Sequence, residues 1–215
     1  MSSKILKISL VILIVALVEI VGAFAFYNNY KPRPSNNLFV YRNIKYGFEI
    51  DYPNNLVPER TFKTFYHLSD KWRAETYVEN SKGIPIVSIP IYRIDNNNYY
   101  PRYYSAEVRV GVSKDPQDIK DCLEIDPSYT NVTSTDEIIN GVTFKKFKIQ
   151  NAAMMQYLSG FSYRTIHNDS CYAIEQLAAG SNYREQASPN DIPDSILNSY
   201  FDKAGEIIKT FKFIR

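Results

Sequence analysis

The sequence predicts an α+β fold, in which an antiparallel β-sheet is flanked by two or three helices and preceded by one N-terminal transmembrane helix. Three observations predict this arrangement. Several short segments alternate apolar and polar residues, as half-buried strands do. Two other segments repeat apolar residues at helical spacing. The mainly apolar run from Ile8 to Phe26 holds a single charged residue and is long enough to cross a bilayer as a helix.

The apolar run divides the chain into an anchor, a linker and a domain. We expect residues 1–27 to be a membrane anchor that contacts the membrane through residues 5–27, because the run is longer than the apolar core of most signal peptides. The triplet Ala23-Phe24-Ala25 also fits a cleavage site, so secretion after cleavage at Ala25 is the alternative. Residues 28–37 are polar and hold two prolines, as an extended linker does. Residues 38–215 then form one domain.

The charges beside the run give only a small bias to its orientation. Lys4 and Lys7 precede it, and Lys31 and Arg33 follow it. A leading hydrophobic segment with short basic flanks usually leaves its N-terminus in the cytoplasm. We therefore expect a single-pass membrane protein whose C-terminal domain is extracytoplasmic.

Strands dominate the first half of the domain. The segment FVYRNIKYGFEIDYP predicts two strands around a turn at Asn43–Gly47. The segment AETYVENSKGIPIVSIPIYR predicts two strands about a turn at Asn80–Gly83, and its Pro85 and Pro90 favour a sheet edge for the second strand. In YSAEVRVGVS, alternate apolar residues from Ala106 onward predict a strand with one buried face.

Two hairpins follow. The dipeptide Asn140-Gly141 is the strongest hairpin signal in the chain. Beyond it the apolar alternation changes phase, so Lys145-Lys146 is predicted to form a β-bulge. The segments FSYRTI and CYAIEQL predict a second hairpin whose loop is HNDS.

Two segments predict helices. In DPQDIKDCLE, Asp115 is placed as the N-cap and Pro116 as the first helical residue, and Cys122 lies on the apolar side. The second helix begins near Asp191 and carries an apolar stripe that runs to Ile208. A short closing strand, TFKFIR, comes directly after it.

Two of these pieces resemble the PsbP-like family. The stretch YGFEIDYP (Tyr46–Pro53) is similar to that family's first core strand, and DKAGEIIKTFKF (Asp202–Phe213) is similar to its final helix and terminal strand. The resemblance implies an α/β/α sandwich that binds or scaffolds rather than catalyses. The two motifs span 20 of the 178 residues of the domain, and no functional residue of the family can be matched position by position.

Cys122 and Cys171 are the only cysteines, and an even number in an exported domain favours a disulfide between them. The competing hypothesis is a hydrolase in which His167 activates a Cys171 thiolate. In a hairpin, however, Asp169 would point from the loop tip into water and would not orient His167. A zinc site built from the two cysteines and His167 would lack a fourth ligand.

The tyrosine-rich stretch NNNYYPRYYS is a possible binding surface for a glycan or a protein partner. Its candidate residues are Tyr99, Tyr100, Arg102, Tyr103 and Tyr104. Tyrosine is abundant throughout the chain, and the favoured alternative is that alternate tyrosines of this stretch pack inward.

Composition narrows the function. A formal charge of +2 from near-equal numbers of basic and acidic residues disfavours nucleic-acid binding. No P-loop, GxGxxG, HExxH or GxSxG pattern occurs, so we expect no enzyme, no cofactor and no metal. The leading hypothesis is a membrane-anchored extracytoplasmic module that binds a protein or a cell-envelope component. The alternatives are the Cys171 hydrolase and a pilin-like envelope subunit. A pilin has a glutamate a few residues into its apolar helix, whereas Glu19 lies late in this run.

Overall fold

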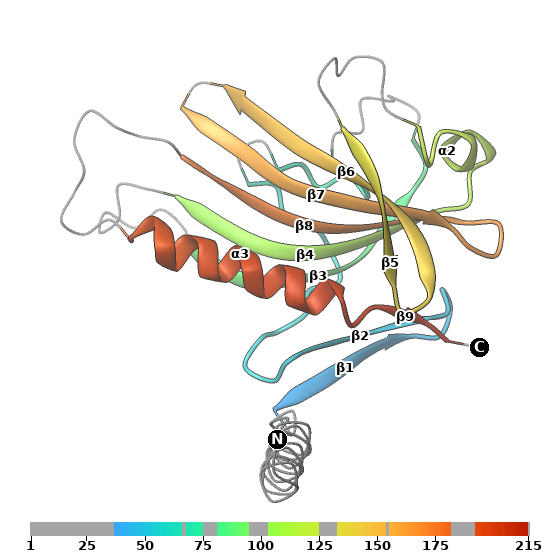
Figure 1. The fold of residues 1–215 in the computed structure, drawn as a ribbon, viewed down its shortest axis with the longest axis horizontal. Helices are drawn as coiled ribbons and strands as arrows, with labels where there is room; N and C mark the ends of the chain where they lie inside the picture. Colours follow the sequence, from blue (N-terminus) through green and yellow to red (C-terminus); the bar gives the residue numbers. More distant parts are fainter. Residues whose placement is uncertain are drawn as a thin grey trace, which may run out of the picture. The chain divides into compact units, whose positions relative to one another are not determined.

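Two antiparallel sheets and two helices form the described part of the chain (Figure 1). The computed structural model describes residues 37–65, 68–74, 81–94, 103–124, 133–153, 155–181 and 192–214. The elements are β1 (Leu38–Asn43), β2 (Phe48–Pro53), β3 (Ile84–Ile94), β4 (Tyr104–Ser113), α2 (Pro116–Lys120), β5 (Ser134–Ile139), β6 (Val142–Ala153), β7 (Gln156–Ile166), β8 (Cys171–Ser181), α3 (Asp194–Ile208) and β9 (Lys212–Phe213).

The strands are divided between a three-stranded sheet, in the order β1-β2-β9, and a six-stranded sheet, in the order β3-β4-β8-β7-β6-β5. All of the pairs are antiparallel. Strand β3 lies at the edge of the larger sheet, as its prolines predict, and its register shifts beside Pro85 and Pro90. These observations confirm the predicted α+β class.

The turns predicted at Asn43–Gly47 and Asn140-Gly141 lie where the sequence places them, whereas the strand predicted before the Asn80–Gly83 turn falls mostly on residues 75–80, which lie outside the described residues. Residues 44–47 join β1 to β2, and Asn140 and Gly141 join β5 to β6 with φ angles of 48° and 81°. A positive φ is the backbone geometry that Asn-Gly turns supply at little cost. The predicted bulge at Lys145-Lys146 is wrong, because the pairing of β5 with β6 is continuous. Phe144 and Phe147 are out of phase because β6 buries side chains on both of its faces.

Both predicted helices are present. Asp115 caps α2, where its Oδ1 accepts a hydrogen bond from the Gln117 amide at 3.0 Å. Helix α2 ends at Lys120, so Cys122 lies in the turn that follows. Helix α3 buries the stripe Leu197, Ala204, Ile207 and Ile208.

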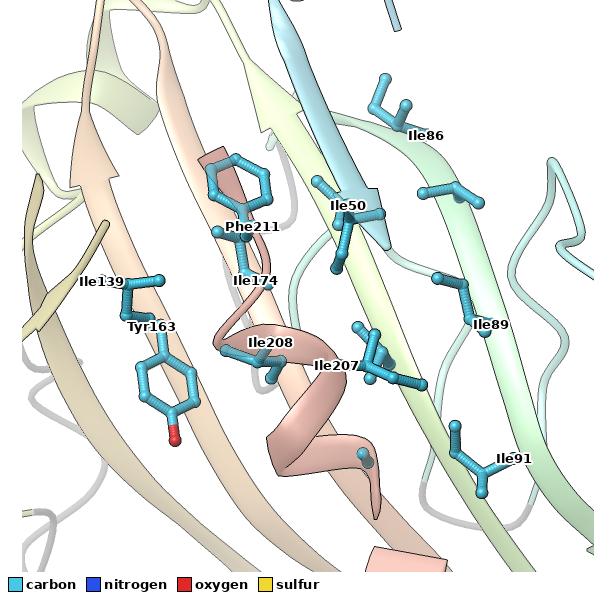
Figure 2. Packing of buried hydrophobic residues seen from close by; sticks show 14 of the residues in the cluster. Ile50, Ile86, Ile89, Ile91, Ile139, Tyr163, Ile174, Ile207, Ile208 and Phe211 are labelled. Carbon is cyan, nitrogen blue, oxygen red and sulfur yellow. The ribbon is translucent and has the colours of Figure 1, made fainter. Parts of the chain in front are cut away.

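The six-stranded sheet has two covered faces, which we name by what covers them. The helix face carries the alternate valines of β4 and packs against α3 and β2 (Figure 2). Figure 2 shows Ile207 and Ile208 of α3 among the buried side chains of this face, together with Ile174 of β8. The loop face carries the other side chains of β4 and β8 and is covered by residues 62–65, residues 68–74 and the α2 region. The sheet is therefore a middle layer, as in a sandwich.

The three-stranded sheet is tied to the end of α3. The rings of Phe48 and Phe211 stack with their centroids 5.3 Å apart. The Asp51 amide donates to Thr210 Oγ1 at 2.9 Å, 159 positions away in the sequence. Residues 207–213 therefore hold the β1–β2 hairpin against the core.

No described helix is long and apolar enough to cross a membrane. The predicted anchor (residues 1–27) and nearly all of the linker 28–37 lie outside the described residues.

Candidate functional site

Cys122 and Cys171 form the predicted disulfide. Their sulfur atoms are 2.04 Å apart, their Cα atoms are 5.8 Å apart, and both residues are fully buried. Cys171 begins β8 and Cys122 follows α2, so the bond fastens α2 to the loop face of the sheet. Trp72 packs in the same cluster. A buried disulfide is typical of proteins that fold in an oxidising compartment.

The neighbouring segment HNDS is a structural turn. His167 and Ser170 exchange backbone hydrogen bonds of 3.0 and 3.1 Å, and Asn168 and Asp169 between them have φ angles of 46° and 51°. The His167 ring stacks on Phe213 at a centroid distance of 3.8 Å. A disulfide-bonded sulfur is not a thiolate, so the hydrolase hypothesis lacks its nucleophile in this state.

Trp72 links the loop face to α2 through a chain of hydrogen bonds. Its Nε1 donates to Ser81 Oγ at 2.5 Å, and Ser81 Oγ donates to Asp118 Oδ1 at 2.9 Å. Asp118 is buried and also accepts from Ser113. A Cβ atom on Gly111 would lie 1.8 Å from the Trp72 carbonyl oxygen, so only glycine permits this close approach.

The structure describes two of the five residues of the possible tyrosine surface, Tyr103 and Tyr104. Tyr104 is 4% exposed, and its hydroxyl donates to the Leu197 carbonyl oxygen at 2.7 Å. Burial raises the pKa of the Tyr104 hydroxyl above its ordinary value. Tyr104 therefore belongs to the core, as the inward-packing alternative states. Tyr103 is half-buried and pairs with Ser181 through its backbone, while Tyr99, Tyr100 and Arg102 lie outside the described residues.

A cluster of buried charges on the loop face was not predicted from the sequence. Glu107 and Arg109 are each 1% exposed, and Arg109 Nη2 lies 2.8 Å from Glu107 Oε1. Ser88 Oγ donates to Glu107 Oε2 at 2.7 Å, and Arg93 Nη2 lies 3.2 Å from the same oxygen. Their alternation with the valines of β4 was the available signal, since it places two charges on a face that a loop then covers.

Arg109 connects this cluster to the covering loop. Its guanidinium donates to the backbone carbonyl oxygens of Ser69 and Lys63, the latter at 2.7 Å, and lies 4.6 Å from the centre of the Phe62 ring. Together with Glu107, these partners leave Arg109 1% exposed. A charge that is buried and hydrogen-bonded to its own chain holds the fold together and is closed to a ligand.

Glu175 belongs to the same face. It is fully buried, and burial raises the pKa of its carboxyl above the ordinary value. The Ala74 amide and the Arg164 guanidinium oppose that rise. A carboxyl with a raised pKa is also a property of catalytic acids, but Glu175 has no exposed surface through which to meet a substrate.

The most exposed apolar stretch of the described chain is β1. Leu38, Phe39 and Val40 are 47%, 55% and 54% exposed in three consecutive positions. Strand β1 lies at the edge of its sheet, where β2 is its described partner (Figure 1). Consecutive exposed apolar residues on an edge strand mark an interaction surface. The sequence predicted the strand but not its exposure, because alternation does not show whether an edge is covered.

No group of three His, Cys, Asp or Glu residues in the described ranges is placed to hold a metal ion.

Comparison with known proteins finds a likeness in structure but none in sequence. No family model matches the chain, and no curated protein matches it by sequence. Among solved structures, the chain is similar to the cyanobacterial PsbP (CyanoP) of Synechocystis, with a TM-score of 0.40 and 13% identity over 82% of this chain and 92% of that chain. PsbP is the namesake of the family that the sequence motifs resemble. At this identity and TM-score, the likeness assigns neither a family nor a function.

Proposed function

We propose that this protein is a membrane-anchored, extracytoplasmic module that binds or assembles with another component and is not an enzyme. The observation that carries the proposal is the buried disulfide between Cys122 and Cys171, which suits an oxidising compartment outside the cytosol. The apolar run from Ile8 to Phe26 supplies the means of export and the anchor.

The binding part of the proposal is supported by β1. Three adjacent exposed apolar side chains on an edge strand are the arrangement that a partner covers. The two side chains best suited to catalysis are not available for it. Cys171 is oxidised in the disulfide and Glu175 is buried, which favours binding over catalysis.

Membership of the PsbP-like family remains part of the proposal. The two motifs that carry the resemblance meet in the structure, where Phe48 pairs with Phe213 and Glu49 pairs with Lys212. Segments that are distant in sequence but adjacent in the fold constrain each other, which is consistent with a shared architecture.

The test uses the full chain in membranes. We expect it to stay with the membrane fraction after carbonate washing, to be degraded by protease added from the extracytoplasmic side, and to carry no free thiol. An Ile14→Arg/Val15→Arg variant should be absent from the membrane fraction, because two arginines at the centre of the run oppose insertion. Its two thiols should stay reduced, because the protein then remains in the cytosol. An Ile138→Arg/Ile166→Arg variant, altered at exposed sites in the domain, controls for added charge.

Cytosolic wild-type protein with two free thiols would contradict the proposal. Reaction of the native, unreduced protein with a thiol-directed hydrolase probe would instead support the Cys171 enzyme.

A further inference from the structure

One edge of β1 has no partner strand in the part of the chain that the structure describes. The strand pairs with β2 from Leu38 to Asn43, and no described strand lies on its other side. In an edge strand, the backbone N–H and C=O groups of alternate residues point away from the sheet without a sheet partner. Another extended strand satisfies these groups.

The other long edge strands carry features that oppose pairing with a further strand, and β1 does not. Strand β3 carries Pro85 and Pro90 and two register shifts, which are common devices against edge pairing. Strand β5 exposes one large apolar residue, Ile138, which directly follows the acidic residues Asp136 and Glu137. Strand β1 has no proline and no shift in its register with β2.

The charge on β1 is held inside its own sheet. Arg42 Nη2 lies 2.7 Å from Glu49 Oε2, on the neighbouring strand. The ion pair reduces the repulsion that a free arginine would exert on an identical strand. The apolar half of β1, Leu38 to Val40, therefore decides what the edge can pair with.

The position of β1 along the chain indicates which partner pairs with its open edge. The apolar run ends at Phe26, so eleven residues separate it from Leu38, a span of at most about 40 Å. If the proposed anchor holds, every copy carries β1 within that distance of the same bilayer surface. Confinement to one membrane raises the effective concentration of one copy for another.

We propose that β1 pairs with β1 of a second copy, in an antiparallel arrangement about a two-fold axis beside Val40. This inference rests on the proposed membrane anchor. The pairing places Phe39 opposite the partner subunit's Tyr41 and joins two three-stranded sheets into one, in the order β9-β2-β1-β1-β2-β9. A two-fold axis perpendicular to the sheet keeps each face continuous across the junction.

A second copy fits this edge better than the bilayer does. Lipid tails can cover Leu38, Phe39 and Val40, but they offer no donor or acceptor to the free edge of the backbone. An identical strand supplies both. One strand per partner is a small interface, so the dimer is expected to be stable in the membrane and to dissociate on dilution in detergent.

Cysteine cross-linking of the full chain in its membrane tests the proposal. The native cysteines are already paired, so a new cysteine is the one free thiol among the described positions. Val40→Cys is expected to give a disulfide-linked dimer under mild oxidation, because the two Cβ atoms face each other across the axis. Leu38→Cys should give several-fold less, because that residue would lie about 14 Å along the strand from its counterpart.

Ile138→Cys is the matched control. Ile138 is 72% exposed on another edge strand and reports random collisions between crowded copies. A second variant, Val40→Lys, places a charge at the axis and should abolish dimers in a chemical cross-linking assay that needs no cysteine. Its unfolding midpoint should match the wild type, because Val40 is exposed.

The outcomes separate the inference from the proposed function. Val40→Cys that stays with the membrane but cross-links no more than Ile138→Cys overturns the dimer and leaves the anchor intact. So does a Val40→Cys adduct with a different protein, or a spin label at position 40 that reports bilayer depth. Loss of all variants and the wild type from the membrane fraction contradicts the anchor instead.

Discussion

Glu175 and Ala74 are joined across 101 sequence positions, where the Ala74 amide lies 3.0 Å from each carboxylate oxygen of Glu175. This contact holds the loop that covers the six-stranded sheet to the strand β8 beneath it. It also leaves a titratable group with no access to water.

The first prediction concerns pH. The folded pKa of Glu175 is raised above the ordinary value of 4.5, so between those two values the native state binds more protons than the unfolded state. The contribution of Glu175 to stability therefore falls as the pH rises through that window, by at most about 1.4 kcal/mol per pH unit. Glu175→Gln keeps an acceptor for Ala74 and removes the titration. Its stability relative to the wild type should rise with pH.

Urea unfolding of both proteins from mildly acidic to neutral pH measures this difference. Glu206→Gln, an exposed change on α3, should run parallel to the wild type. Parallel curves for Glu175→Gln as well would show that Glu175 has the same pKa in the folded and unfolded states.

The second prediction concerns the disulfide. The bond joins residues 49 positions apart, and the loss of such a loop constraint lowers the unfolding free energy by about 4 kcal/mol in the chain-entropy model. Fully reduced protein should unfold at a much lower urea concentration than oxidised protein. A Cys122→Ala/Cys171→Ala variant should unfold at the same low urea concentration as the reduced protein, and reductant should not change its stability.

Trp72 reports the same change independently. It is the only tryptophan and packs beside the disulfide, which quenches indole fluorescence on contact. Reduction of the folded protein should therefore brighten its emission, and the double alanine variant should be bright from the start. Unchanged emission after complete reduction, verified by mass, would contradict the packing.

The third prediction concerns the outer face of the small sheet. Hydrogen bonds from Lys212 and then Arg42 hold the pKa of the Glu49 carboxyl below its ordinary value. Stability from a depressed acidic pKa is present above the unfolded value and is lost as the pH falls through the folded value. Glu49→Gln should be less stable than the wild type at neutral pH, and the gap should close in acid and in high salt.

Thermal unfolding across that pH range measures the effect. Asp136→Asn, an exposed acidic change on β5, is the control. A gap that persists below the folded pKa would mean that Glu49 acts through packing and not through its charge.

The fourth prediction concerns Asn140. Its Nδ2 donates to the carbonyl oxygens of Lys209 at 3.0 Å and Phe211 at 2.8 Å, so the β5–β6 turn caps the end of α3. Asn140→Gly keeps the positive φ and removes both bonds, which should lower the unfolding free energy by about 1–2 kcal/mol. Gly141→Asn is a useful contrast, since it alters the turn but leaves the Asn140 side chain in place. Hydrogen exchange at residues 209–211 should speed up in the first variant only.

The elements of the fold followed from local patterns, and their assembly did not. Alternation in YSAEVRVGVS and the Asn140-Gly141 turn are local signals, and the structure confirms both. The false bulge at Lys145-Lys146 arose because a strand buried on both faces does not alternate. A change of phase in the apolar pattern cannot distinguish a β-bulge from a strand that is buried on both faces.

The sites show a similar division. The disulfide was predictable because only two cysteines exist and one lay on an apolar face. The alternation of Glu107 and Arg109 with the valines of β4 placed the two charges on one face of the strand, but their partners outside β4 come from residues 62–93, so no local pattern showed that this face is buried. The exposure of β1 was equally hidden, because it depends on where the other strands stop.

The pairing of β2 with β9 sets an order on biogenesis. Residues 38–53 leave the ribosome early, but their place against Phe211 and Phe213 exists only when residues 207–213 have followed. If the chain is exported with its N-terminal segment first, as proposed, it holds an unprotected hairpin at the membrane surface until more than 150 further residues have crossed. The yield of folded protein is then governed by how well the export machinery or a holding chaperone shields that early hairpin from its neighbours.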